Sequence, residues 1–322
     1  MKRITYLAGL PRSGSTLLSN LLAMHSDVQA TPSSPLCEIV QNMRKQWSDN
    51  TFLLSQLDDN FPVVHERLKR SMWAFMQAWS SDNTNPVVID KNRGWLFALE
   101  WLRELDPDFK MIIALRDIRD VYASIEKKHR KTLFIDFPDH MEHNIVDQRA
   151  NALFADGGII GSILKAIQNM YDIPDIMSHI YYWRFEDFLN RPTEVMHNLF
   201  EFINLEPIDI AFDNIVQSTH ESDSFYRMKY EHKIYNSIRK PMTHKEIPIS
   251  PRIIKEIENR FQWYFEQFYS DYKEKELVQG HNADPINSTS NSHIANENDG
   301  HNNDDTTTMI ADLERAIQQE TN

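Results

Sequence analysis

The chain has 322 residues, 41% hydrophobic and 25% charged, which is enough to bury the core of one large α/β domain or of two modest ones. Eight glycines are too few for a collagen-like or glycine-rich disordered protein, and a single cysteine excludes an internal disulfide, a thiolate metal cluster and a CxxC redox site. The formal net charge of −13 argues against general nucleic-acid binding, which requires a positive field.

The beginning of the chain lacks the pattern of a signal peptide or a membrane span. The apolar run from Ile4 to Leu10 is shorter than either segment requires. The lone Cys37 fits a reducing compartment. We therefore predict a cytoplasmic protein without a membrane span.

Short apolar runs of strand length alternate with longer helical patterns along the chain. We expect strands at 4–8, 87–89, 111–115 and 180–183. We expect helices at 16–24, 63–79, 95–105, 118–128, 143–171, 193–203 and 251–269. Strand followed by helix, repeated, predicts an α/β fold in which a P-loop-like parallel β-sheet is flanked by helices.

The C-terminal part differs in composition. Residues 280–308 are rich in Asn, Asp, Ser and Thr and almost lack large apolar side chains, so burial cannot offset the entropy of ordering them. Residues 309–322 place apolar side chains at helical spacing. We predict an α/β domain over 1–279, a disordered linker over 280–308 and a short amphipathic helix over 309–322. That helix could dock on the domain, bind a partner or a second copy, or fray.

The negative charge is concentrated in this tail. From Gly280 to Asn322 there are eight acidic residues and one arginine, a net of −7, which leaves −6 on residues 1–279. The α/β domain is therefore only mildly acidic, and a local basic pocket is compatible with its charge.

The first expected strand ends in a loop similar to a phosphate-binding loop. Residues 9–16 read GLPRSGST and match the P-loop pattern G-x-x-x-x-G-K-[ST], except that Ser15 replaces the lysine. The backbone N–H groups of such a loop and of the helix after it form a cradle for an anion. Without the lysine, which neutralises the β- and γ-phosphates, an ordinary ATPase or kinase is disfavoured. The candidate anion-binding residues are Pro11, Arg12, Ser13, Gly14, Ser15 and Thr16; the alternative is a plain strand-to-helix turn with Ser13 as N-cap.

A second set of polar residues follows the strand expected at 111–115. Arg116 stands at the end of this strand, and Ser124 and Lys128 follow on the next helix. Because ligands of open parallel sheets bind beyond the carboxyl ends of the strands, these residues could form a second oxyanion site beside the first loop. The alternative is a surface charge cluster with pairs along one helix.

Together the two motifs resemble those of sulfotransferases that use 3′-phosphoadenosine 5′-phosphosulfate (PAPS). In that family a loop of the form PRSGTT binds the 5′-phosphosulfate, and an arginine at a strand end with a serine eight residues later binds the 3′-phosphate. Arg116 and Ser124 have that separation. The resemblance covers roughly residues 4–270. It implies PAPS as co-substrate, no metal, and transfer of a sulfuryl group to a hydroxyl or amine.

The resemblance also suggests catalytic residues. The segment Asp90-Lys91-Asn92 is similar to an Asn-Lys-Asp segment of tyrosylprotein sulfotransferases, which implies that Lys91 neutralises the leaving oxygen. The Arg239-Lys240 pair resembles a late basic loop that contacts the nucleotide phosphates. No carboxylate follows His25-Ser26-Asp27-Val28 where tyrosylprotein sulfotransferases have their base, which argues against peptide tyrosine as acceptor. By resemblance to heparan-type enzymes, Glu38 is the candidate general base.

Two other functions stay open at this point. One is a nucleotide or small-molecule kinase that uses Arg12 and Lys91 with Mg²⁺. The other is a non-catalytic nucleotide or anion sensor whose acidic tail recruits a partner. The sequence does not identify the acceptor or the oligomeric state.

Overall fold

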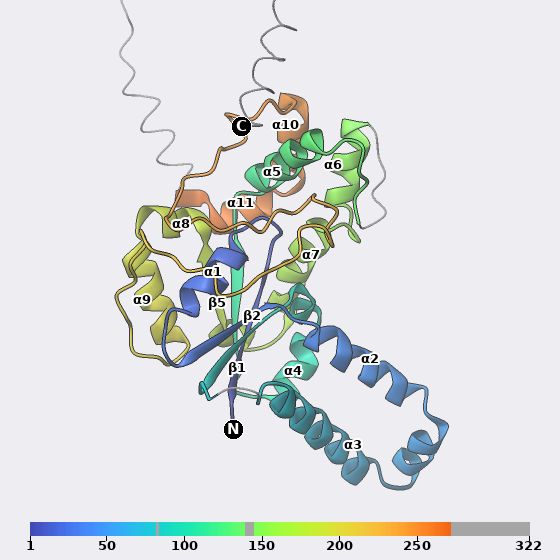
Figure 1. Cartoon of the computed structure of the whole chain (residues 1–322). Coiled ribbons are helices and arrows are strands. Elements are labelled where there is room, and N and C mark those ends of the chain that lie inside the picture. Colours follow the sequence, from blue (N-terminus) through green and yellow to red (C-terminus); the bar gives the residue numbers. More distant parts are fainter. Residues whose placement is uncertain (82–83, 139–144, 272–322) are drawn as a thin grey trace, which may run out of the picture. The chain divides into compact units, whose positions relative to one another are not determined.

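A sheet of five parallel strands, in the order β2-β3-β1-β4-β5, lies at the centre of the structure (Figure 1). The computed structural model describes residues 1–81, 84–138 and 145–271. The strands are β1 (Arg3–Gly9), β2 (Val28–Ser33), β3 (Val87–Lys91), β4 (Lys110–Leu115) and β5 (Ile180–Arg184). The predicted α/β fold with a parallel sheet is therefore confirmed.

Helices cover both faces of this sheet, because its inner strands are apolar on both sides. The helices of one face are α1 (Ser15–Leu22), α8 (Phe185–Asn190) and α9 (Pro192–Phe202), and they share a buried cluster with Leu7 of β1. On the other face Tyr6 of β1 packs edge-on against Trp95, with ring centroids 4.7 Å apart. Trp95 belongs to the 3₁₀ helix η1 (Arg93–Phe97).

The remaining helices complete the covering layers and a protruding pair. They are α2 (Leu36–Ser48), α3 (Thr51–Trp79), α4 (Leu99–Leu105), α5 (Ile118–Lys131), α6 (Val146–Phe154), α7 (Gly161–Asn169), α10 (Pro251–Arg260) and α11 (Gln262–Phe268). Short 3₁₀ helices, η2 (Met170–Asp172) and η3 (Ile176–His179), precede β5. Figure 1 shows α2 and α3 as a pair that extends away from the sheet.

Several elements differ from the sequence-based expectations. Helices α2 and α8 were not expected, and the helices expected at 95–105 and 251–269 are each divided in two. Strand β2 was not expected, and it lies at the edge of the sheet, where Pro32 is tolerated because it needs no ladder partner. The single helix expected at 143–171 is wrong: α6 and α7 are separated by a turn that contains Gly157 and Gly158. Helix α3 begins twelve residues before the expected position and is kinked at Asn60, two residues before Pro62.

The predicted linker (280–308) and terminal helix (309–322) lie outside the described residues and stay predictions. Within the described part of the chain, no helix combines the length and the apolar character needed to cross a membrane.

Candidate functional site

The loop between β1 and α1 has the backbone geometry of an anion cradle. Gly14 is the N-cap of α1 with φ +84°, and a Cβ there would lie 2.8 Å from the ring of Phe185. The first turn of a helix leaves N–H groups without intrahelical partners, and Ser15 and Thr16 of that turn line a cavity of about 430 Å³. Ser13 is not the N-cap, since its hydroxyl donates instead to the carbonyl of Leu10 at 2.7 Å.

The second predicted cluster lies beside this loop, at the same edge of the sheet. The Arg116 Nη1 donates to the carbonyl oxygen of Arg12 at 2.9 Å, and the Arg12 Nε donates to the Ser124 hydroxyl at 3.2 Å. Arg12 has a left-handed backbone, with φ +59°. Burial, with a smaller contribution from the neighbouring Arg116, lowers the pKa of Arg12.

Arg116 is a buried guanidinium with unused donors. It is 5% exposed and lies over the ring of Phe185 at 5.3 Å. Its Nε and Nη2 have no hydrogen-bond partner among the described residues. A buried cation with unmet donors is costly in a folded protein, and an anion in the adjoining cavity would satisfy it.

The other predicted basic residues take different positions. Arg239 and Lys240 line the same cavity as Arg116, and Arg239 stacks on the ring of Tyr235 at 3.9 Å. Lys128 is paired with Glu231 at 2.9 Å. Glu231 also accepts a hydrogen bond from Arg12 through its backbone carbonyl. Lys128 therefore contacts Glu231, which lines the cavity, and does not itself line it.

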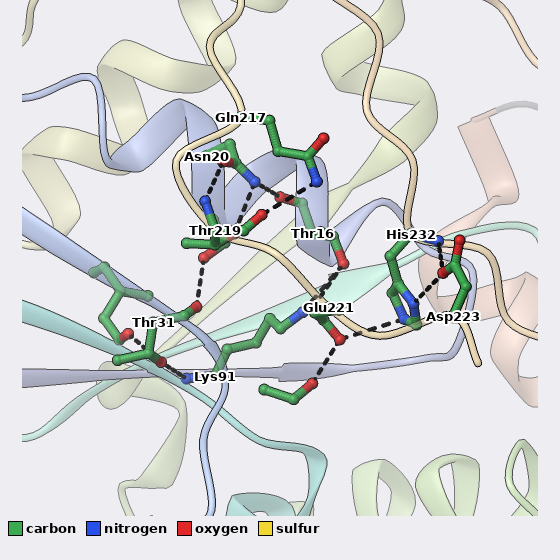
Figure 2. Close-up of polar contacts among 12 residues, drawn as sticks. Thr16, Asn20, Thr31, Lys91, Gln217, Thr219, Glu221, Asp223 and His232 are labelled. Carbon is green, nitrogen blue, oxygen red and sulfur yellow. Dashed lines mark hydrogen bonds and ion pairs between the residues drawn. The ribbon is translucent and has the colours of Figure 1, made fainter. Parts of the chain in front are cut away.

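Lys91 reaches the phosphate loop from the end of β3. Its Nζ donates to the Thr16 hydroxyl at 3.1 Å and forms an ion pair with Glu221. The pair is nearly closed to solvent, since the side chains of Lys91 and Glu221 are 8% and 3% exposed. Figure 2 shows Lys91 and Thr16 pointing at the same carboxylate. Lys91 thus stands where it could contact a group held by the loop.

Glu221 has further partners on its other oxygen. Its Oε2 accepts from the Ser33 hydroxyl at 2.8 Å and lies 3.4 Å from the Nε2 of His232. The Nδ1 of His232 lies 3.2 Å from Asp223 (Figure 2). Burial alone would raise the pKa of Glu221, but the contact with the Lys91 ammonium lowers it below its ordinary value. Glu221 is therefore ionised at neutral pH.

The predicted base Glu38 lies on a different cavity. It is exposed in the first turn of α2 and accepts a hydrogen bond from the Asn92 amide at 2.7 Å. The cavity that it lines has a volume of about 1,010 Å³. Ser33, Asn92, Arg93, Glu221 and Tyr226 line both cavities. The two cavities therefore adjoin at Glu221.

Sequence reasoning did not assign a role to Glu221, His232 or Asp223. All three lie between α9 and α10, in residues 203–250, which are described and contain no helix or strand. No motif or periodicity marks these residues. Among the described residues, no three His, Cys, Asp or Glu side chains gather closely enough to hold a metal ion.

Comparison with known proteins assigns the chain to a family. A family model described as "Sulfotransferase family" matches residues 5–209, which are 205 of the 322 residues. The chain therefore belongs to the sulfotransferase family. The match includes the phosphate loop, Lys91 and Arg116, and ends before Glu221.

Individual proteins share only part of their sequence with this chain, at low identity. Protein-tyrosine sulfotransferase 1 of Danio rerio is 28% identical over 128 residues, which are 39% of this chain and 36% of that protein. Protein-tyrosine sulfotransferase A of Caenorhabditis elegans is 25% identical over 122 residues, 37% of this chain and 32% of that protein. The matched segment thus spans about a third of the length of these curated relatives.

Solved structures of sulfotransferases are similar to this chain as well. The sulfotransferase domain from the curacin biosynthetic pathway has a TM-score of 0.43 and 18% identity, with 65% of this chain and 76% of that domain covered. The sulfotransferase from Alicyclobacillus acidocaldarius has a TM-score of 0.44 and 13% identity, over 70% of this chain and 88% of that one.

Proposed function

We propose that the protein transfers a sulfuryl group from PAPS to a hydroxyl or amine acceptor. The observation that carries this proposal is Arg116, whose buried guanidinium has two nitrogens without partners at the wall of a cavity that also contains the phosphate loop. Two anion-binding elements on one cavity fit a ligand with two separated phosphate groups. Membership of the sulfotransferase family supports PAPS as that ligand.

The donor's 5′-phosphosulfate is assigned to the phosphate loop. Backbone N–H groups at the start of α1 bind the phosphate oxygens, with the hydroxyls of Ser15 and Thr16 beside them. Arg12 lines the cavity while its side chain donates to Ser124 and to the Glu231 carbonyl, so it contributes its positive field to binding. The 3′-phosphate is assigned to Arg116, with Ser124 and Arg239 close to the same region.

Lys91 is assigned to the transition state. Sulfuryl transfer is expected to resemble phosphoryl transfer, so negative charge builds on the oxygen that bridges to the leaving phosphate. The Lys91 Nζ lies 3.1 Å from the Thr16 hydroxyl, next to the loop that holds that phosphate. Its charge would neutralise the leaving oxygen in place of the lysine that this P-loop lacks.

Ligand selectivity tests the proposal. We expect adenosine 3′,5′-bisphosphate to raise the melting temperature of the full chain, because a ligand that binds only the folded state stabilises it by an amount that grows with the logarithm of the ligand concentration divided by the dissociation constant. Adenosine 5′-monophosphate and ATP with Mg²⁺ should raise it much less. Incubation with ³⁵S-labelled PAPS should then label an acceptor or release sulfate. A shift with ATP and Mg²⁺ alone would support a kinase instead, and bisphosphate binding without any transfer would support a sensor.

A further inference from the structure

Glu221 stands at the boundary between the cavity assigned to the donor and the larger second cavity. Its side chain is 3% exposed and lines both cavities. The donor cavity contains the phosphate loop and Arg116, whereas the second cavity contains Glu38 and exposed aromatic rings such as Phe225. An acceptor bound in the second cavity would reach the donor past Glu221.

The segment that carries Glu221 is attached to helix α1 by hydrogen bonds to Asn20. Two residues earlier in the chain, the Thr219 backbone N–H donates to the Oδ1 of Asn20 on α1 at 3.0 Å. The Asn20 amide in turn donates to the Thr219 hydroxyl at 2.9 Å (Figure 2). This buried exchange attaches an otherwise irregular segment to α1, directly behind the phosphate loop.

The contacts of the carboxylate place it at the point of reaction. Its Oε1 contacts Lys91 and accepts from the Thr16 hydroxyl at 3.1 Å, and both of these groups are assigned to the donor. Its Oε2 accepts from Ser33 at 2.8 Å, on the wall of the second cavity. A purely structural pair of buried charges would add little stability, because desolvation offsets most of the attraction.

The Lys91 ammonium and the hydrogen-bond donors around Glu221 keep it ionised. Lys91 approaches from β3, and His232 and Asp223 approach from the segment that carries Glu221 itself. Thr16 and Ser33, from α1 and β2, are neutral donors. Glu38, by contrast, is exposed and bound to Asn92, without a contact to Lys91 among the described interactions.

We propose that Glu221, rather than Glu38, is the general base that takes the proton of the acceptor; this inference rests on the proposed sulfuryl transfer. As the acceptor oxygen forms its bond to sulfur, the bond between sulfur and the bridging oxygen breaks, and its electron pair stays on the 5′-phosphate beside Lys91. The acceptor's proton passes to a Glu221 carboxylate oxygen. His232 and Asp223 are assigned as positioning residues, because His232 contacts Glu221 and Asp223 contacts His232.

The test compares two acceptors that differ in their need for a base. At about pH 8, phenol keeps its proton, since its pKa is close to the value of about 10 for tyrosine, whereas 4-nitrophenol is largely ionised. With ³⁵S-labelled PAPS, we expect Glu221→Gln to lower the rate of transfer to phenol at least about a hundredfold, the usual scale of general-base catalysis. Transfer to 4-nitrophenol should fall less than about tenfold. Sulfate release to water, which also needs a base, should fall as it does with phenol.

Controls separate this role from folding and binding. Glu194→Gln removes an exposed carboxylate on α9 and should leave the rates unchanged. Glu221→Gln should bind adenosine 3′,5′-bisphosphate at least as tightly as the unaltered protein, because a negative charge beside the donor is removed. If the amide variant does not fold, Glu221→Asp keeps the negative charge but moves the carboxylate one methylene farther from its contacts. It should show the same preferential loss of transfer to phenol.

Four results would overturn the assignment. With Glu221→Gln, these are a rate of transfer to phenol equal to that of the unaltered protein, a rate above it, or equal losses of rate with phenol and 4-nitrophenol. The fourth is a larger loss of transfer to phenol with Glu38→Gln than with Glu221→Gln. If the unaltered protein transfers sulfate to none of a panel of phenol, sugar-hydroxyl and amine acceptors, nor to water, sulfuryl transfer itself is contradicted.

Discussion

Substitution of Arg116 by methionine removes the positive charge while keeping a long, unbranched side chain at this position. In the folded protein this guanidinium is 5% exposed, donates one hydrogen bond to Arg12, and leaves two nitrogens unpartnered among the described residues. Losing the bond to Arg12 costs about 1.5–3 kcal/mol, and removing buried unsatisfied donors returns about 1–3 kcal/mol. We therefore expect the free energy of unfolding without ligand to change by less than about 2 kcal/mol.

Binding should respond much more strongly than stability. A charge-assisted contact between Arg116 and a 3′-phosphate is worth about 2 kcal/mol or more, a factor of about 30 in the dissociation constant. Calorimetric titration with adenosine 3′,5′-bisphosphate and with adenosine 5′-monophosphate separates the contribution of the 3′-phosphate. In the unaltered protein the bisphosphate should bind far more tightly, and in Arg116→Met the two affinities should converge.

A remote arginine provides the matched control. Arg252 on α10 is 56% exposed and paired with Asp147 and Glu256, so Arg252→Met removes the same charge at a distance from the cavity. It should keep the preference for the bisphosphate. If Arg116→Met keeps that preference as well, the guanidinium does not bind the 3′-phosphate and the reasoning from its unmet donors is wrong.

Three further substitutions test the loop, the cation and the buried acid beside it. Lys91→Met should lower single-turnover transfer by about 100-fold or more while bisphosphate affinity changes less than about tenfold, because the charge acts on the leaving oxygen; equal losses would indicate ordinary binding. Gly14→Ala should lower the free energy of unfolding by about 1–2 kcal/mol through the positive φ, and by more through the contact with Phe185. The melting temperature should fall by several degrees. Gly157→Ala, where a Cβ meets nothing within 4 Å, is its control. Burial raises the pKa of Asp90 from 3.8 to about 6, so the folded state holds a proton that the unfolded state releases. As pH rises from about 4 to about 6, this group should lower the free energy of unfolding by about 3 kcal/mol, measured as the difference between the unaltered protein and Asp90→Asn in urea titrations. Asp90→Asn should remove this pH dependence, and an unchanged slope would assign it to other groups.

The parts of the site that lie on regular elements were predictable from the sequence. The loop around Gly14 and the strand-end Arg116 each carry a local pattern, and the topology of a parallel sheet brings strand ends together. Their proximity in the structure, through the hydrogen bond from Arg116 to Arg12, follows from these two facts. Lys91 was suggested only by resemblance, because a single lysine at a strand end has no distinctive pattern.

The unexpected parts have physical reasons. Glu221 meets Lys91 across 130 positions of sequence, from a segment without helix or strand, so no periodicity could indicate the contact. Strand β2 lies at the edge of the sheet and contains a proline, and both features weaken a strand signal. The division between α6 and α7 did have a signal in Gly157 and Gly158, since glycine disfavours a helix interior.

Regular elements supply the phosphate loop, Lys91 and Arg116 of the donor cavity. These residues come from strand ends and the start of α1, whereas Arg239 and Lys240 come from the irregular segment between α9 and α10. Ladder hydrogen bonds hold the strand ends in register. Much of the second cavity is lined by loops, including the irregular stretch around Phe225. Substitutions and insertions in loops disturb a fold far less than changes in a central sheet. We therefore expect that directed evolution could redirect this protein to new acceptors while nucleotide recognition stays intact.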